Sequence, residues 1–204
     1  MERLSSIVAL VLGVSLLTAC SYGPEVGKLT PCSDEPEWVS RGGGEFDWQG
    51  GKDIVAVGVG AHEPKLDVRL EKARADARSK LASQLGAYTA ELADSLSQNL
   101  KMYFDPKATD AAGFFREAAK PVVEAALEGH NELAWWHCPV TQELFVLVRV
   151  PESQFLDAYK QQVHKFVLER REQVFKQNTQ EALKRFDQEL DKLRGRRARG
   201  YLKV

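Results

Sequence analysis

Apolar positions in the middle of the chain follow two different periods. Between Asp53 and Ala61, valines alternate with small residues, which predicts a strand with one nearly bare face. From Pro64 to about Leu100, apolar residues recur at steps of three and four, which predicts a long amphipathic helix. Its segment 73–82 is rich in small residues. We therefore expect this segment to lie close against the bare face of the strand.

Further along the chain, the pattern predicts one more helix and a hairpin. The helix is expected at about 110–127, ending at Gly129. Segments 132–138 and 143–150 predict two antiparallel strands, and the second strand is apolar on both faces. We therefore expect both faces of the sheet to be covered. With a final helix, the order is β-α-α-β-β-α, an α+β fold in which a small antiparallel sheet packs with helices.

Residues 152–204 are predicted to form a long basic C-terminal helix and tail. No helix breaker follows Pro151 before Gly195. About 43 residues at ~1.5 Å each would span roughly 64 Å, which is longer than the domain can cover. We therefore expect the helix to project from the domain beyond about Arg170. The tail at 194–203 either binds an anionic polymer, lipid head groups or an acidic partner, or serves as a solubilising extension.

Residues 1–19 have the features of a lipoprotein signal peptide. The apolar stretch 7–17 is much shorter than the ~20 residues that a membrane-spanning helix needs. Leu17 and two small residues then precede Cys20, which resembles the lipobox of bacterial lipoproteins. This motif predicts cleavage before Cys20 and its acylation; the alternative is an ordinary secretory signal with a chance cysteine. Ser21, in place of aspartate, implies an outer-membrane location facing the periplasm.

A tether is expected between the acylated cysteine and the folded domain. Residues 20–52 are predicted to form a lipidated tether and glycine-rich loop, followed by the α+β domain at 53–151. The apolar island 36–39 within the tether is expected to dock on the domain. The glycines do not form a phosphate-binding loop, because Lys52 is followed by aspartate and the segment precedes a strand.

Charge is balanced overall but not along the chain. The formal net charge is −1, which gives no reason to expect a nucleic-acid partner. Residues 20–151 carry 14 Lys and Arg against 20 Asp and Glu, a balance of −6, while residues 152–204 carry 13 against 8, a balance of +5. The C-terminal quarter is thus a basic element on an acidic body.

Two cysteines remain once Cys20 is acylated. An exported protein permits disulfides, and a bridge between Cys32 and Cys138 is predicted, with two unpaired thiols as the alternative. The spacing typical of zinc ligands is missing, so no metal and no cofactor is expected.

Catalytic motifs do not stand out. The four histidines are scattered, and His137 and Cys138 are strand neighbours that point to opposite faces, so no catalytic residue is predicted. Arg74 near Glu71, and Asp76 four residues before Lys80, are interpreted as a solvated helix face instead of a phosphate site. The chain is therefore predicted not to be an enzyme.

Large aromatic residues are the candidates for an interface. Trp135 and Trp136 are neighbours on a strand, so they are expected to point to opposite faces. Either both are buried because the sheet is covered twice, or they belong to an oligomer interface, where tryptophan is enriched. Candidate interface residues are Trp135, Trp136 and Phe145 on the hairpin, and Phe175 and Phe186 on the long helix.

A series of short motifs resembles a known family. In order, the chain holds the lipobox, Pro-Glu-Trp-Val at 36–39, Val-Gly-Val-Gly at 57–60, Ala-Arg-Ala-Asp-Ala-Arg-Ser-Lys-Leu-Ala at 73–82, Trp-Trp at 135–136 and Leu-Phe-Val-Leu-Val at 144–148. This order resembles the Lpp-twenty family of outer-membrane lipoproteins, over about residues 20–165. The resemblance implies an outer-membrane-tethered α+β domain without known catalysis, and some members are associated with the flagellar basal body. The extended basic helix departs from the shorter members.

Two hypotheses about function follow from the sequence. The first is a non-enzymatic outer-membrane lipoprotein that acts as a structural or scaffolding module, self-associating or binding an envelope protein, and flagellum-associated as in the resembling family. The second is a periplasmic regulator that docks on an envelope enzyme through the long C-terminal helix.

Overall fold

The computed structural model describes residues 32, 34–48, 51–61, 63–104, 110–174 and 179–198. The chain divides into two units, residues 1–33 and 34–204. The fold is that of the second unit, because Cys32 is the one described residue of the first.

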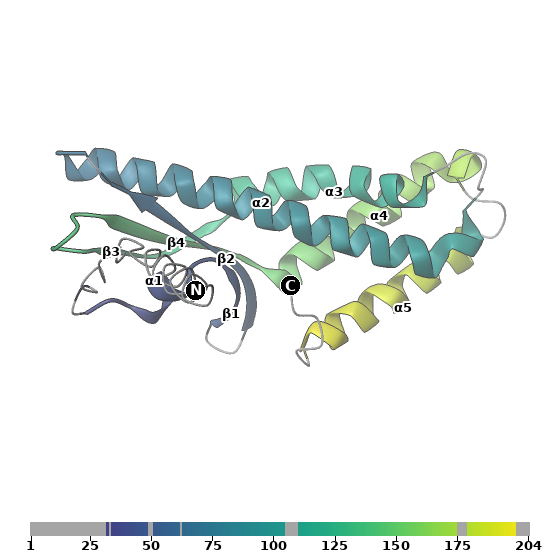
Figure 1. Ribbon diagram of the computed structural model, residues 1–204. Coiled ribbons are helices and arrows are strands. Elements are labelled where there is room, and N and C mark those ends of the chain that lie inside the picture. Colours follow the sequence, from purple (N-terminus) through teal and green to yellow (C-terminus); the bar gives the residue numbers. More distant parts are fainter. Residues whose placement is uncertain are drawn as a thin grey trace, which may run out of the picture. The chain divides into compact units, whose positions relative to one another are not determined.

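The second unit is an α+β domain, as the sequence predicts. Its four strands form one antiparallel sheet in the order β1-β2-β4-β3. The helix α2 lies on the sheet and continues past it into a bundle with α3, α4 and α5 (Figure 1). The elements are α1 Glu37–Arg41, β1 Gly44–Trp48, β2 Gly51–Gly60, α2 Leu66–Leu100, the 3-10 helix η2 Lys101–Tyr103, α3 Ala111–Glu128, β3 Asn131–His137, β4 Leu144–Pro151, α4 Glu152–Val174 and α5 Thr179–Ala198.

The glycine-rich loop contains a strand that the sequence pattern does not reveal. Strand β1 pairs with the first half of β2, from Gly44 opposite Val55 to Trp48 opposite Gly51. Glycines are disfavoured in strands, so composition predicts a loop here. Pairing with the edge of β2 supplies the backbone hydrogen bonds that outweigh this weak local preference.

Small residues allow α2 to lie directly on the backbone of β2. A Cβ on Gly60 would lie 2.0 Å from the carbonyl oxygen of Arg69, and Gly58 is similarly enclosed by Ala73 and Ala77. The predicted close contact between segment 73–82 and the bare face of the strand is therefore confirmed.

Both faces of the sheet carry packed apolar side chains. The helix-facing side belongs to the main core, in which β2 and β4 pack against the helices. The opposite side carries a smaller cluster made by Trp38, Val55, Val57 and Leu147. Trp38 belongs to α1, so the predicted docking of segment 36–39 on the domain is confirmed.

The C-terminal helix does not project as one rod, so that prediction was wrong. Helix α4 ends at Val174, and α5 is a second helix that packs against α2 and α4 and extends past Gly195 to Ala198. Its apolar stripe is buried: Ala182, Phe186, Leu190 and Leu193. Folding back removes this stripe from water, which a projecting helix would leave exposed.

Polar contacts fasten α5 to α4. The carboxylate of Asp187 lies 2.7 Å from Nε2 of His164 and 3.3 Å from Nζ of Lys160. Arg194 donates to Asp157 at 2.6 Å. These three side chains of α4 are spaced along one face, so polar contacts join the two helices between Asp187 and Arg194 of α5.

Candidate interaction surface

The side of the sheet opposite α2 carries half-buried aromatic residues next to the Trp38 cluster. Trp136 of β3 stands opposite Phe145 of β4, and their ring centroids are 5.7 Å apart. Leu133 and Ala134 are also partly buried there. We call the surface formed by Leu133, Ala134, Trp136 and Phe145 the outer sheet face. Among the described elements, α1 covers part of this side, and these four residues keep access to solvent.

Trp135 lies on the other side of the same strand. It is opposite Val146, a core residue on the helix-facing side, whereas Trp136 belongs to the outer sheet face. The expectation that the two tryptophans point to opposite faces is therefore confirmed. Trp135 is 57% exposed, so the alternative in which both are buried is wrong.

Phe186 is not available for an interface on the surface of the chain. It is 2% exposed and stacks on Phe115, with ring centroids 5.9 Å apart. Its prediction as an interface residue was wrong, because α5 folds back and buries it. Phe175 lies outside the described residues.

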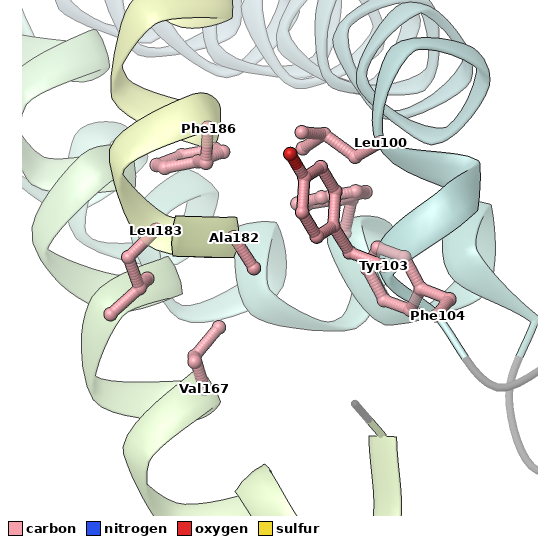
Figure 2. A pocket seen from close by; sticks show the side chains of 8 residues that line it. Leu100, Tyr103, Phe104, Val167, Ala182, Leu183 and Phe186 are labelled. Carbon is pink, nitrogen blue, oxygen red and sulfur yellow. The ribbon is translucent and has the colours of Figure 1, made fainter. Parts of the chain in front are cut away.

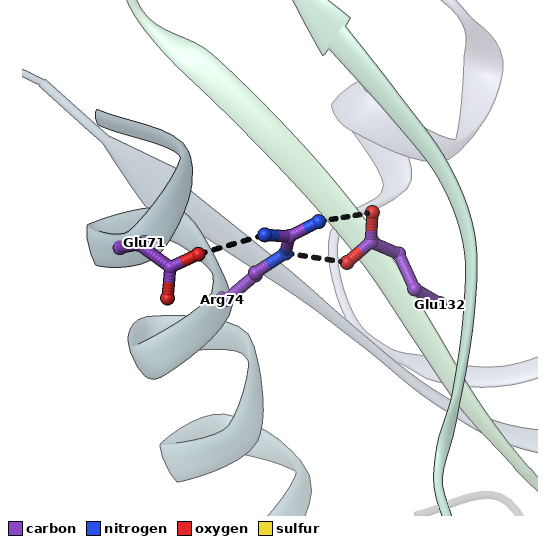
Figure 3. A network of polar contacts seen from close by, with 3 residues as sticks. All are labelled: Glu71, Arg74 and Glu132. Carbon is purple, nitrogen blue, oxygen red and sulfur yellow. Dashed lines mark hydrogen bonds and ion pairs between the residues drawn. The ribbon is translucent and has the colours of Figure 1, made fainter. Parts of the chain in front are cut away.

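An arginine ties α2 to the edge strand β3. Nε and Nη2 of Arg74 donate to the two carboxylate oxygens of Glu132 at 2.8 and 3.3 Å, and Nη1 donates to Glu71 at 2.7 Å (Figure 3). The hydrogen bonds from Glu132, and next those from Glu71, raise the pKa of the Arg74 guanidinium above its usual range. Arg74 is solvated as predicted, but it also has a bidentate partner 58 residues away that the helix spacing does not reveal.

Asp76 and Lys80 contact the backbone of β2 in its second half, which β1 does not pair with. The carboxylate of Asp76 accepts the amide N–H of Val59 at 2.8 Å, and Nζ of Lys80 donates to the carbonyl oxygen of Val57 at 3.1 Å. These two side chains also pair with each other at 2.7 Å. The predicted i,i+4 pair on a solvated helix face is therefore confirmed, and its contacts with the backbone of β2 are an addition that the helix spacing does not reveal. The pair satisfies a strand edge that would otherwise offer unpaired groups to another chain.

A buried arginine joins the start of α2 to the β3–β4 turn. Nη1 of Arg69 donates to the carbonyl oxygen of Gln142 at 2.5 Å and lies 3.2 Å from Nε2 of His137. Arg69 is buried, although it stands in the first turn of a helix. We call this end of the domain, formed by residues 63–69 and 135–142, the hairpin corner. Sequence reasoning missed Arg69, because nothing in the local pattern separates it from the neighbouring exposed charges.

The two cysteines outside the lipobox motif are oxidised. Cys32 and Cys138 are both disulfide-bonded, and both are buried. The unpaired-thiol alternative is therefore excluded.

The bundle end of the domain contains a small apolar cavity. Leu100, Val167 and Phe186 are among its lining residues (Figure 2). Its volume of about 10 Å³ is no more than a single water molecule needs, and its walls offer almost no polar groups. This cavity is too small to bind a substrate or cofactor.

The described part of the chain offers neither a metal-binding cluster nor a membrane-spanning helix. No group of three or more His, Cys, Asp or Glu side chains is placed there to hold a metal ion. None of the described helices combines the length and the apolar character needed to cross a bilayer.

Comparison with known proteins gives this chain no family assignment. The resemblance to the Lpp-twenty family stays a prediction from the order of short motifs. Comparisons with protein-family models, with curated proteins and with solved structures find no match to this chain.

Proposed function

We propose that this chain is a lipoprotein anchored to the outer membrane through Cys20, where it acts as a non-enzymatic structural module of the cell envelope. The lipobox at 17–20, directly after a short apolar stretch, is the observation that carries the anchoring. Two or more acyl chains give stable membrane attachment, because each buried methylene contributes about 0.8 kcal/mol. The domain then works at the periplasmic side of that membrane.

The disulfide-bonded cysteines support an exported location. Disulfides persist in the periplasm and outside the cell, whereas cytosolic thiols are kept reduced. Cys32 and Cys138 are both disulfide-bonded, which an exported location permits.

The outer sheet face supports a role in binding another protein. Trp136 and Phe145 form a half-buried aromatic pair beside Leu133, and aromatic residues are enriched at protein–protein interfaces. We propose that a second copy of the chain or another envelope protein covers this face. The regulator alternative relied on a free C-terminal helix, and it is not favoured because the apolar stripe of α5 is buried in its own domain.

Photo-cross-linking in living cells tests the binding surface. A photoreactive phenylalanine derivative is placed at Trp136 or at Phe145, and a matched control carries it at Glu124, an exposed residue of α3. The proposal predicts discrete adducts, with a second copy or with one envelope protein, from positions 136 and 145 and none from position 124. Equal labelling at all three positions would overturn the proposed surface.

A further inference from the structure

The hairpin corner gathers exposed apolar side chains at one end of the domain. Leu66, in the first turn of α2, is 51% exposed, and Val140, in the β3–β4 turn, is 67% exposed. Trp135, two residues before His137, and Val68, in the first turn of α2, are also exposed. Arg69 holds these segments together through its contacts to His137 and Gln142. The start of α2 and the tip of the hairpin lie at the same end of the domain in Figure 1.

Charges at this corner are balanced. Glu63 and Lys72 form an ion pair, and the exposed Lys65 and Asp67 carry opposite signs on either side of Leu66. A phospholipid surface therefore meets no strong like-charge repulsion here. Tryptophan has an amphipathic ring and is enriched at the level of lipid head groups, where exposed aliphatic side chains can also leave water.

The predicted bridge between Cys32 and Cys138 would attach the lipidated tether directly before the β3–β4 turn. Cys138 directly precedes the turn that holds Val140, and the predicted bridge joins it to Cys32. Eleven residues, 21–31, separate Cys20 from Cys32, and twelve links reach at most about 40 Å when fully extended. The 35 residues of α2 span about 52 Å, so the bundle end is much farther from the attachment point.

We propose that the hairpin corner is the membrane-facing end of the domain and that Leu66, Trp135 and Val140 contact the phospholipid surface. The tether keeps the corner at high local concentration near the bilayer, so a contact that is weak by itself is still populated. This inference rests on the proposed lipid anchor. It further assigns an orientation, with the hairpin corner toward the membrane and the outer end of the bundle toward the periplasm.

Tryptophan quenching by brominated lipids tests the orientation. The full acylated protein, purified from cell envelopes, is placed on vesicles of phosphatidylethanolamine with a minor share of phosphatidylglycerol, with or without bromine on the acyl chains. The wild type is expected to lose part of its emission to bromine. Trp135→Phe is expected to lose most of this quenching, whereas the matched control Trp136→Phe, changed at the next residue on the opposite face, is expected to retain it.

Hydrogen exchange on the same vesicles gives a second measurement that does not depend on fluorescence. Amides of residues 65–69 and 140–142 are expected to exchange more slowly on vesicles than in detergent, and those around Met102 at the bundle end are expected not to change. Equal quenching of wild type and Trp135→Phe, or protection at Met102 instead, would overturn the orientation while leaving the anchor intact. A protein that does not sediment with the vesicles would instead overturn both the anchor and this inference.

Discussion

Gly58 of β2 and Ala77 of α2 are in direct backbone contact. A Cβ built on Gly58 would lie 2.2 Å from the backbone nitrogen of Ala77 and 2.0 Å from the carbonyl oxygen of Ala73. No side chain fits between the helix and the strand at this point. The contact sets the height of α2 over the sheet, and with it the positions of Arg69 and Arg74 beside the hairpin.

Gly58→Ala is therefore expected to destabilise the domain. The added methyl meets backbone atoms that cannot rotate away, and overpacking of this kind costs about 1–3 kcal/mol or more of unfolding free energy. Urea unfolding measures the change. The matched control is Gly86→Ala, because nothing lies within 4 Å of a Cβ at this exposed helix position. This change is expected to stabilise by roughly 0.5–1 kcal/mol. A neutral Gly58→Ala would contradict the close contact.

Phe186 and Trp135 should respond in opposite ways to truncation. Phe186→Ala removes a side chain buried among Phe115, Tyr159 and His164, and such changes cost about 3–5 kcal/mol. Trp135→Ala removes an exposed side chain and is expected to cost less than about 1 kcal/mol. Thermal unfolding of both variants measures the contrast. Similar losses would mean that α5 does not fold back onto the bundle.

Reduction of the disulfide is expected to destabilise the domain without unfolding its core. A bridge between Cys32 and Cys138 closes a loop of about 105 residues, and the chain-entropy model then allows up to about 4.7 kcal/mol. Denaturant unfolding with and without a reductant measures the difference, and Cys32→Ser with Cys138→Ser provides a variant that should no longer respond to it. An identical midpoint in both conditions would contradict a bridge across this loop.

Tyr159 should make stability fall at high pH. Burial raises its pKa above the ordinary value near 10, and its hydroxyl donates to the carbonyl oxygen of Phe115 at 3.3 Å. Above pH ~10 the unfolded chain loses this proton while the folded chain keeps it, so unfolding becomes progressively more favourable. Below that pH the stabilisation is complete. In urea unfolding between pH 9 and 11, the unfolding free energy of Tyr159→Phe is expected to fall less steeply than that of the wild type. An unchanged slope would show that Tyr159 does not cause the decline.

The sequence predicts the elements whose side chains carry a clear period. The alternation at Val55, Val57 and Val59 and the small residues of α2 indicate both the strand and what lies on it, because packing here depends on side-chain size. Strand β1 escapes prediction, because its pairing with β2 comes from backbone hydrogen bonds that composition does not record. The packing of α5 against its own domain was missed for a related reason. An apolar stripe shows that a helix face is buried, but it does not show which partner buries that face.

Part of the candidate surface was predicted from the sequence, and part of it was missed. Trp135 and Trp136 could be assigned to opposite faces from strand geometry alone. The contacts of Arg69 with the turn, and of Asp76 with the amide of Val59, join residues that are distant in sequence, so no local spacing indicates them. Phe186 looked like a surface residue because the helix that carries it was expected to project.

Attachment of fatty chains to Cys20 is the claim on which the functional account depends. Intact-mass analysis of the protein extracted from cell membranes, combined with metabolic labelling by a palmitate analogue, tests it directly. The account predicts a mature chain that begins at Cys20 with the added mass of a thioether-linked diacylglycerol and one N-linked acyl chain, three acyl chains in all. It also predicts that a Cys20→Ser variant is unlabelled and released from the membrane fraction. An unmodified N-terminus, or a Cys20→Ser variant that stays membrane-bound to the same extent, would contradict it.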